Sequence, residues 1–193
     1  MAIAHRKFVS AVVLLTAAAL AGCSAQPGTA AVINGTKITE GELDDATLEY
    51  VGLTGQEAQP SVVLNTLLAA EIFPSIAAEY GLALSDEQVT ERLQEQAALQ
   101  GADIPADGYS EAFIDLGHYL FSSIEAQARP DAAAIFQEFT TAMAEADIEV
   151  NPRYGQVGED GIIAPSDKDW LATPEAAPGT TPEAAPGATP GQG

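Results

Sequence analysis

Residues 61–80, SVVLNTLLAAEIFPSIAAEY, constrain the fold more than any other stretch of this 193-residue chain. On a helix with 100° between successive residues, Val62, Phe73 and Ile76 share one side, and the other large apolar side chains spread over the remainder. A helix that is apolar nearly all round must be covered by neighbours on several sides. We therefore expect residues 61–80 to be the core helix of a predominantly helical domain.

The residues around this helix predict where it begins and ends. Ser61 is a candidate N-cap with Pro60 just outside the helix, and Gly81 can adopt the left-handed conformation that ends helices. Pro74 lies inside the helix, where it removes a backbone hydrogen bond. We expect a kink at Pro74, and a complete break at residue 73 is the alternative.

Four more segments carry the signals of a helix start followed by apolar residues. Thr39 and Ser85 are candidate caps with Glu or Gln three residues later, Ser110 is a third cap, and Pro130 suits the first turn of a helix. The predicted helices cover residues 40–51, 86–100, 110–128 and 131–146. The second of them has only a narrow apolar stripe, which predicts a peripheral position.

Two short segments have the character of β-strands. Val32 and Ile33 precede an Asn-Gly turn and a short return strand, and residues 148–150 are the other candidate. Neither is long enough to be stable alone, so we expect the two to pair. The predicted fold class is therefore mostly α: a bundle of about five helices, closed by a small β pairing of the N-terminal and C-terminal strands, over residues 31–155.

The first 22 residues have the pattern of a signal peptide, with a basic start before an apolar stretch that is short for a membrane span. The stretch ends in Leu20-Ala21-Gly22-Cys23, which is similar to the bacterial lipobox. In that motif cleavage precedes the Cys, and its thiol receives a diacylglycerol; a buried thiol is the alternative for a lone Cys. The resemblance implies an exported protein anchored at Cys23 to the outer face of the plasma membrane, with residues 23–30 as a lipidated tether.

The charge balance excludes some classes of partner. Without residues 1–22 the chain has 28 acidic and 5 basic side chains, a net charge of −23. Nucleic acids and anionic lipid head groups would be repelled by such a surface. We therefore expect no nucleic-acid partner, and membrane contact only through Cys23.

The C-terminal part is unlike the rest of the chain. Residues 156–172 are expected to be an extended segment, and residues 173–193 repeat the motif TPEAAPG. Sequence of this kind lacks the apolar side chains that build a core, so we expect a disordered Pro/Ala-rich tail. A passive tail is the favoured interpretation, and a wall-spanning or O-glycosylated segment is the alternative.

Three segments together resemble the N-terminal, peptide-binding domain of the SurA and PrsA family of extracytoplasmic folding factors. They are VINGTKITEGEL (32–43), LNTLLAAEIFPSIAAEYGLALSDEQV (64–89) and IEVNPRYG (148–155). The resemblance implies chaperone-like binding of unfolded polypeptides. Many relatives insert a parvulin-type prolyl isomerase domain before the last segment, but here Met143 is followed almost directly by Ile148. We therefore expect a binding protein and not an enzyme.

The sequence offers little for catalysis. Asp115 and His118, three residues apart on one predicted helix, could form an acid–base pair or half a metal site, but a surface pair is the favoured interpretation. Zinc-ligand spacing, a nucleophile elbow and a phosphate-binding loop are not found in the sequence. Calcium could bind weakly to aspartate pairs, namely Asp44 with Asp45 and Asp103 with Asp107. A solvated acidic surface accounts better for these aspartates, and we expect no metal and no cofactor.

The aromatic residues of the last two predicted helices are the candidate binding residues. They are Phe113, Tyr119, Phe121, Phe136 and Phe139. Most are expected in the core, and the alternative is a cradle between helices that accepts apolar segments of unfolded clients. The function expected is that of a lipid-anchored, non-catalytic chaperone or holdase. A structural envelope lipoprotein that scaffolds one fixed partner is the alternative, and a residual prolyl isomerase is a weaker third.

Overall fold

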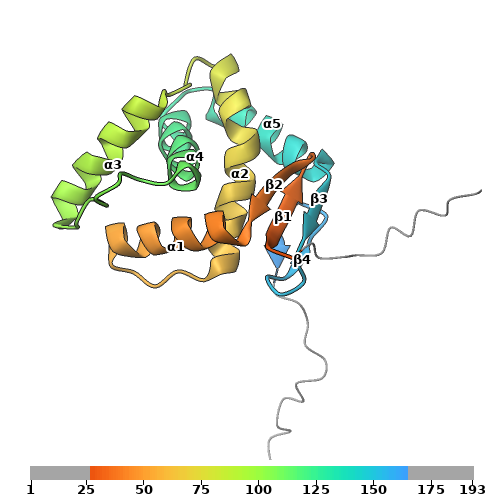
Figure 1. Ribbon diagram of the computed structural model, residues 1–193. Helices are drawn as coiled ribbons and strands as arrows, with labels where there is room; N and C mark the ends of the chain where they lie inside the picture. The colour runs from red at the N-terminus through yellow and green to blue at the C-terminus, as the bar shows by residue number, and fades with distance from the viewer. Residues whose placement is uncertain (1–26, 165–193) are drawn as a thin grey trace, which may run out of the picture.

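The computed structural model describes residues 27–164, so the predicted signal peptide, Cys23 and the repeat tail lie outside the described residues. The elements are β1 (Thr29–Ile33), β2 (Thr36–Thr39), α1 (Glu40–Thr54), α2 (Pro60–Glu79), α3 (Asp86–Gln100), α4 (Glu111–Gln127), α5 (Ala132–Glu145), β3 (Ile148–Val150), β4 (Gln156–Val157) and β5 (Ile163–Ala164). Five helices with a small antiparallel sheet beside them (Figure 1) confirm the predicted fold class.

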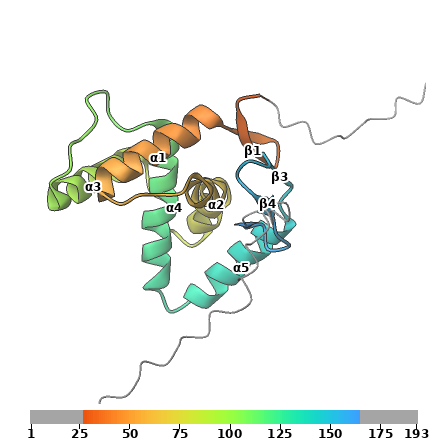
Figure 2. The same cartoon turned by 90° about the horizontal axis from the view of Figure 1, so that it is seen from below.

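Helix α2 is the core of the domain. Figure 2 shows it nearly end-on, with α1, α4, α5 and the strands around it. Ten of its 20 residues are buried, and Leu64, Leu68 and Phe73 are completely covered. By length and composition α2 could also cross a membrane, but the neighbours that cover it are those of a core helix. The prediction that this helix is covered on several sides is confirmed.

The boundaries of α2 differ from the prediction at its start. The helix begins at Pro60 with Gln59 as N-cap, not after a Ser61 cap. Proline suits this first position because the backbone N–H groups of the first turn have no partner within the helix, so the missing N–H of proline costs nothing there. Helix α2 runs unbroken through Pro74, so the alternative of a break at residue 73 is wrong. At the other end the predicted left-handed Gly81 is confirmed.

The predicted caps Thr39, Ser85 and Ser110 are confirmed. The Thr39 hydroxyl accepts a hydrogen bond from the Glu42 N–H at 3.1 Å, and the Glu42 carboxylate accepts one from the Thr39 N–H at 2.6 Å. Ser85 forms the same capping box with Gln88. Pro130 is misplaced, as Ser61 was, because α5 begins two residues later, after an Asp131 that is paired with the Arg129 guanidinium.

The sheet joins the two ends of the domain. Its strand order is β2-β1-β3, and Val32 and Ile33 lie opposite Glu149 and Ile148 in an antiparallel ladder. The predicted pairing of the N-terminal and C-terminal strands is thereby confirmed. Strand β1 begins at Thr29 and Ala30 is fully buried, so the domain starts inside the segment predicted as tether, 23–30.

The domain also ends later than predicted. Residues 156–164, expected to be extended, form a β4–β5 hairpin that is attached to α2 through one side chain. The Asn65 amide donates to the Ile163 carbonyl at 3.1 Å and accepts from the Ile163 N–H at 2.8 Å. Gly155 has φ +140°, and any Cβ there would collide with the Ala164 carbonyl oxygen. Among the described residues the packed elements therefore run from Thr29 to Ala164, beyond both ends of the predicted 31–155.

Candidate peptide-binding groove

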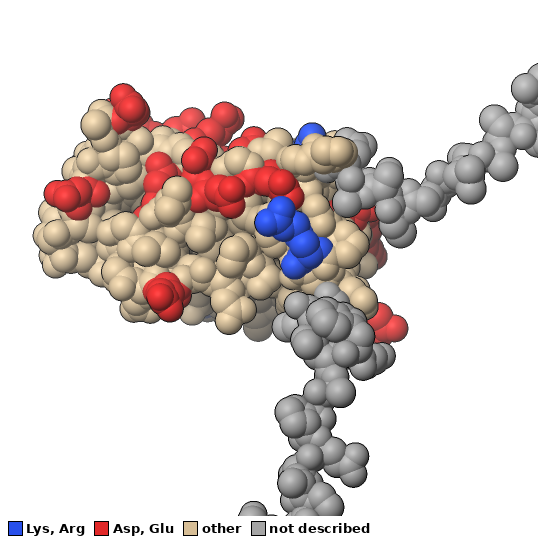
Figure 3. All heavy atoms as spheres, turned by 60° about the horizontal axis from the view of Figure 1, so that its bottom comes forward, with Lys and Arg blue, Asp and Glu red and all other residues tan. Residues whose placement is uncertain are grey.

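The acidic side chains are spread over the surface of the domain. Figure 3 shows one face on which Asp and Glu are numerous, some of them in a row, and Lys and Arg are few. Within residues 27–164 no three His, Cys, Asp or Glu side chains come together in a group that could hold a metal ion. Among the described residues the acidic surface therefore offers charge but no cluster of metal-ligating side chains.

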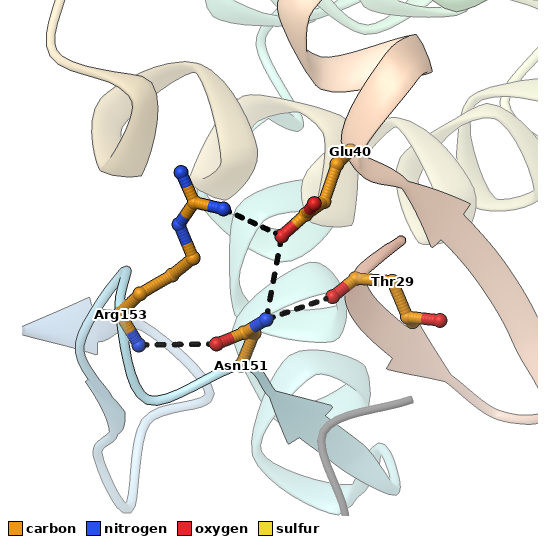
Figure 4. A network of polar contacts seen from close by, with 4 residues as sticks. All are labelled: Thr29, Glu40, Asn151 and Arg153. Atoms are coloured by element: carbon orange, nitrogen blue, oxygen red, sulfur yellow. Dashed lines mark hydrogen bonds and ion pairs between the residues drawn. The ribbon is translucent and has the colours of Figure 1, made fainter. Parts of the chain in front are cut away.

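A polar network connects the two ends of the domain (Figure 4). Glu40, in the first turn of α1, accepts hydrogen bonds from the Arg153 guanidinium at 2.8 Å and from the Asn151 amide at 3.5 Å. The Asn151 amide also donates to the Thr29 carbonyl at 3.2 Å, and its oxygen accepts from the Arg153 N–H at 3.2 Å. Thr29, Glu40 and Asn151 lie at the ends of strands or next to them, and Arg153 lies in the turn between β3 and β4, so we assign this network to the closure of the sheet.

Asp115 and His118 do not pair with each other. The His118 Nε2 lies 2.9 Å from the Asp86 carboxylate in the first turn of α3. His118 and Asp115 line a hollow of about 420 Å³, which Glu71 of α2 also lines. Burial raises the pKa of the Asp115 carboxyl, repulsion from Glu111 raises it further, and His118 acts in the opposite direction. The predicted surface pair of Asp115 with His118 is therefore not formed, and the contact of His118 with Asp86 joins α4 to α3.

The raised pKa of Asp115 predicts a pH dependence of stability. Because the pKa is higher in the folded than in the unfolded chain, the folded state binds more protons, so stability from this group is lost as the pH rises from the unfolded-state pKa through the folded-state pKa. We expect Asp115→Asn to raise the melting temperature at pH 7 and to make it fall less as the pH rises from acidic to neutral values. Asp103→Asn, with the same charge change in an exposed loop, is the control, and an equal effect of both variants would contradict the assignment.

The structure separates the five predicted aromatic residues into two groups. Phe113 is 1% exposed and belongs to the core, and Phe121 lies elsewhere on α4, under the Arg92 guanidinium at 5.7 Å. The other three gather around Phe73 of α2. Their ring centroids lie 5.4, 5.8 and 5.3 Å from that of Phe73 for Tyr119, Phe136 and Phe139. The core interpretation is therefore correct for Phe113, and a shared cluster exists only for three of the five.

An apolar groove of about 430 Å³ lies beside this cluster, between α2, α5 and the β4–β5 hairpin, with Tyr119 of α4 also lining it. Phe139 and Tyr119 line it together with Ala69 and Met143, which are both 6% exposed. Two large side chains at its edges are open to solvent: Val62 is 59% and Ile162 is 52% exposed. We call this site the apolar groove. Its volume lies within the range of binding pockets for small ligands and single side chains.

The polar side chains at the edge of the apolar groove are already engaged within the chain. The hydroxyls of Thr66 and Thr140 donate to carbonyls one turn earlier in their own helices. Asn65 is occupied by Ile163, and the Asp160 carboxylate accepts from the Ile162 N–H at 3.1 Å. Most of the lining is apolar, so the apolar groove would select a ligand mainly by its apolar character.

The sequence analysis found two residues of the apolar groove, Tyr119 and Phe139, among its candidates for binding. It placed Val62 in the core helix without a role at the surface, and it placed Ile162 in an extended segment. The apolar pair Ile162-Ile163 after Gly161 is the signal that could have indicated a hairpin there.

Three comparisons with known proteins gave no match, whether with a family model, a curated protein or a solved structure. Function is therefore inferred from the residues of this chain.

Proposed function

We propose that this protein is a lipid-anchored, extracytoplasmic chaperone or holdase that binds apolar segments of unfolded polypeptides without catalysis. The observation that carries the proposal is the apolar groove, with exposed Val62 and Ile162 at its edges and Tyr119 and Phe139 in its lining. Large apolar side chains exposed around a hollow are typical of interaction sites. The predicted lipobox at Cys23 and the resemblance to SurA and PrsA support the location and the class of client.

The chemistry of the apolar groove determines what kind of client it suits. Its lining is mostly apolar, so a client would be recognised by one or two apolar or aromatic side chains. We expect micromolar affinity, about −8 kcal/mol. Because the mature chain carries a net charge of −23, basic clients would associate faster at low ionic strength.

A change at the edge of the apolar groove tests this function. We expect Val62→Asp to weaken the binding of an unfolded client about tenfold, because it removes an apolar contact worth roughly 1.5 kcal/mol and adds a charge. The fold should tolerate the change, since Val62 is 59% exposed and lies in the first turn of α2, where a negative charge is favourable. Peptide titration and suppression of aggregation by the mature chain measure the effect.

Leu48→Asp is the matched control, because Leu48 is a 70% exposed aliphatic residue on α1 and is not part of the apolar groove. Equal loss of binding in the two variants would assign the effect to charge and not to the apolar groove. If the parent chain binds no unfolded client and crosslinking recovers one fixed partner, the protein is a scaffold. Acceleration of a proline-limited refolding reaction would place it among the isomerases.

A further inference from the structure

The apolar groove lies where the chain leaves the described domain. Ile162 forms part of its edge, and β5 ends at Ala164 only two residues later. The next residues, 165–172, have the sequence PSDKDWLA and lie outside the described residues. They contain Trp170, the single Trp of the chain, followed by Leu171. The largest apolar side chain of the sequence is thus six residues away from the end of β5.

The β4–β5 hairpin fixes the point at which the chain leaves the described domain, the end of β5 at Ala164. Ile163 is attached to Asn65 by two hydrogen bonds, and Asn65 itself lines the apolar groove. Pro165 favours an extended conformation at Ala164. Six extended residues span about 20 Å. Trp170 can therefore reach the apolar groove, because Ile162 at its edge lies only two residues before Ala164, the end of β5.

We propose that Trp170 and Leu171 dock in the apolar groove when no client is bound. An indole ring buries roughly 150–250 Å² and gains most on an apolar surface such as that of Val62, Tyr119 and Phe139. The apolar groove, at about 430 Å³, has room for such side chains. Lys168 lies between Asp167 and Asp169, so the docking rests on the apolar side chains of Trp170 and Leu171 and not on charge.

Because Trp170 is tethered to the domain, even a weak contact is sufficient to occupy the apolar groove. A short flexible linker gives an effective concentration on the order of millimolar, so a millimolar contact would cover the apolar groove for about half of the time. A micromolar client would then displace the segment. This competition rests on the proposed function, whereas the docking of Trp170 itself does not depend on any client.

The fluorescence of Trp170 tests the docking in the soluble chain from Ser24 to Gly193, because no other Trp contributes. We expect a blue-shifted emission and shielding from acrylamide in the parent. Val62→Asp should shift the emission to the red and raise the quenching constant about twofold, whereas Leu48→Asp should change neither. Circular dichroism checks that both variants are folded. Emission of a fully exposed indole in the parent, or no response to Val62→Asp, overturns the proposal.

A Trp-free peptide of Phe, Leu and Lys tests the competition. We expect the peptide to expose Trp170, and we expect Trp170→Ala to raise its affinity about twofold to tenfold, while Thr180→Ala in the repeat tail leaves the affinity unchanged. A peptide that binds the parent while Trp170 is exposed throughout overturns the docking and supports the proposed function. A shielded Trp170 in a chain that binds no peptide supports the docking and overturns the proposed function.

Discussion

Phe73→Ala is expected to destabilise the domain by about 3–5 kcal/mol, a large part of the stability of a single domain. Phe73 is completely buried in α2, and the rings of Tyr119, Phe136 and Phe139 surround it at centroid distances below 6 Å. These rings come from α4 and α5, so the cavity would remove contacts that hold three helices together. Urea unfolding of the mature chain, followed by circular dichroism, measures the loss.

Phe121→Ala is the matched control, because it removes the same side chain from a half-buried position on α4. Phe121 lies under the Arg92 guanidinium and outside the aromatic cluster, so we expect a loss of about 1 kcal/mol. A cost below about 1.5 kcal/mol for Phe73→Ala would show that the cluster is not the centre of the core.

Cys23→Ser is expected to release the protein from the membrane almost completely. The Leu20-Ala21-Gly22-Cys23 sequence predicts a diacylglycerol on the Cys23 thiol, and two acyl chains hold a protein stably where one chain does not. The serine variant should be unprocessed or shed into the medium. Cell fractionation and mass spectrometry of the N-terminus measure both outcomes.

Ser24→Ala, a change next to the lipidation site, is the control and should leave the protein in the membrane fraction. A Cys23→Ser protein that stays membrane-bound at the processed mass would disprove the lipid anchor. In that case another segment must attach the chain to the membrane. Helix α2 is a poor candidate, because its buried residues form the core of the domain.

Local chemistry made much of the fold predictable from the sequence. The capping boxes of Thr39 and Ser85 involve partners only three residues away, and Gly81 ends α2 through contacts within one turn. The pairing of β1 with β3 spans more than 100 residues, yet it was predictable, because these were the two clear strand candidates and each needed a partner. Interactions that are either local or without competitors can be read from the order of residues.

Other features depend on contacts that periodicity does not contain. The β4–β5 hairpin has strands of two residues, too short for an alternating pattern, and its attachment to Asn65 joins residues 98 positions apart. His118 illustrates the same limit, because three-residue spacing indicated Asp115 as its partner and the packing of α3 on α4 provides Asp86 instead. The spacing of residues on one helix does not show which side chains a neighbouring helix places beside them.

The apolar groove is where the tertiary structure decided most. The sequence by itself determined that Val62 and Phe73 lie on one helix and that Phe113 and Phe139 are large apolar residues on two others. Tertiary packing then buried Phe73 and Phe113 and left Val62 exposed beside Phe139. The physical reason is that apolar side chains drive burial without direction. Which of them remain at the surface depends on how far α5 and the β4–β5 hairpin extend over α2.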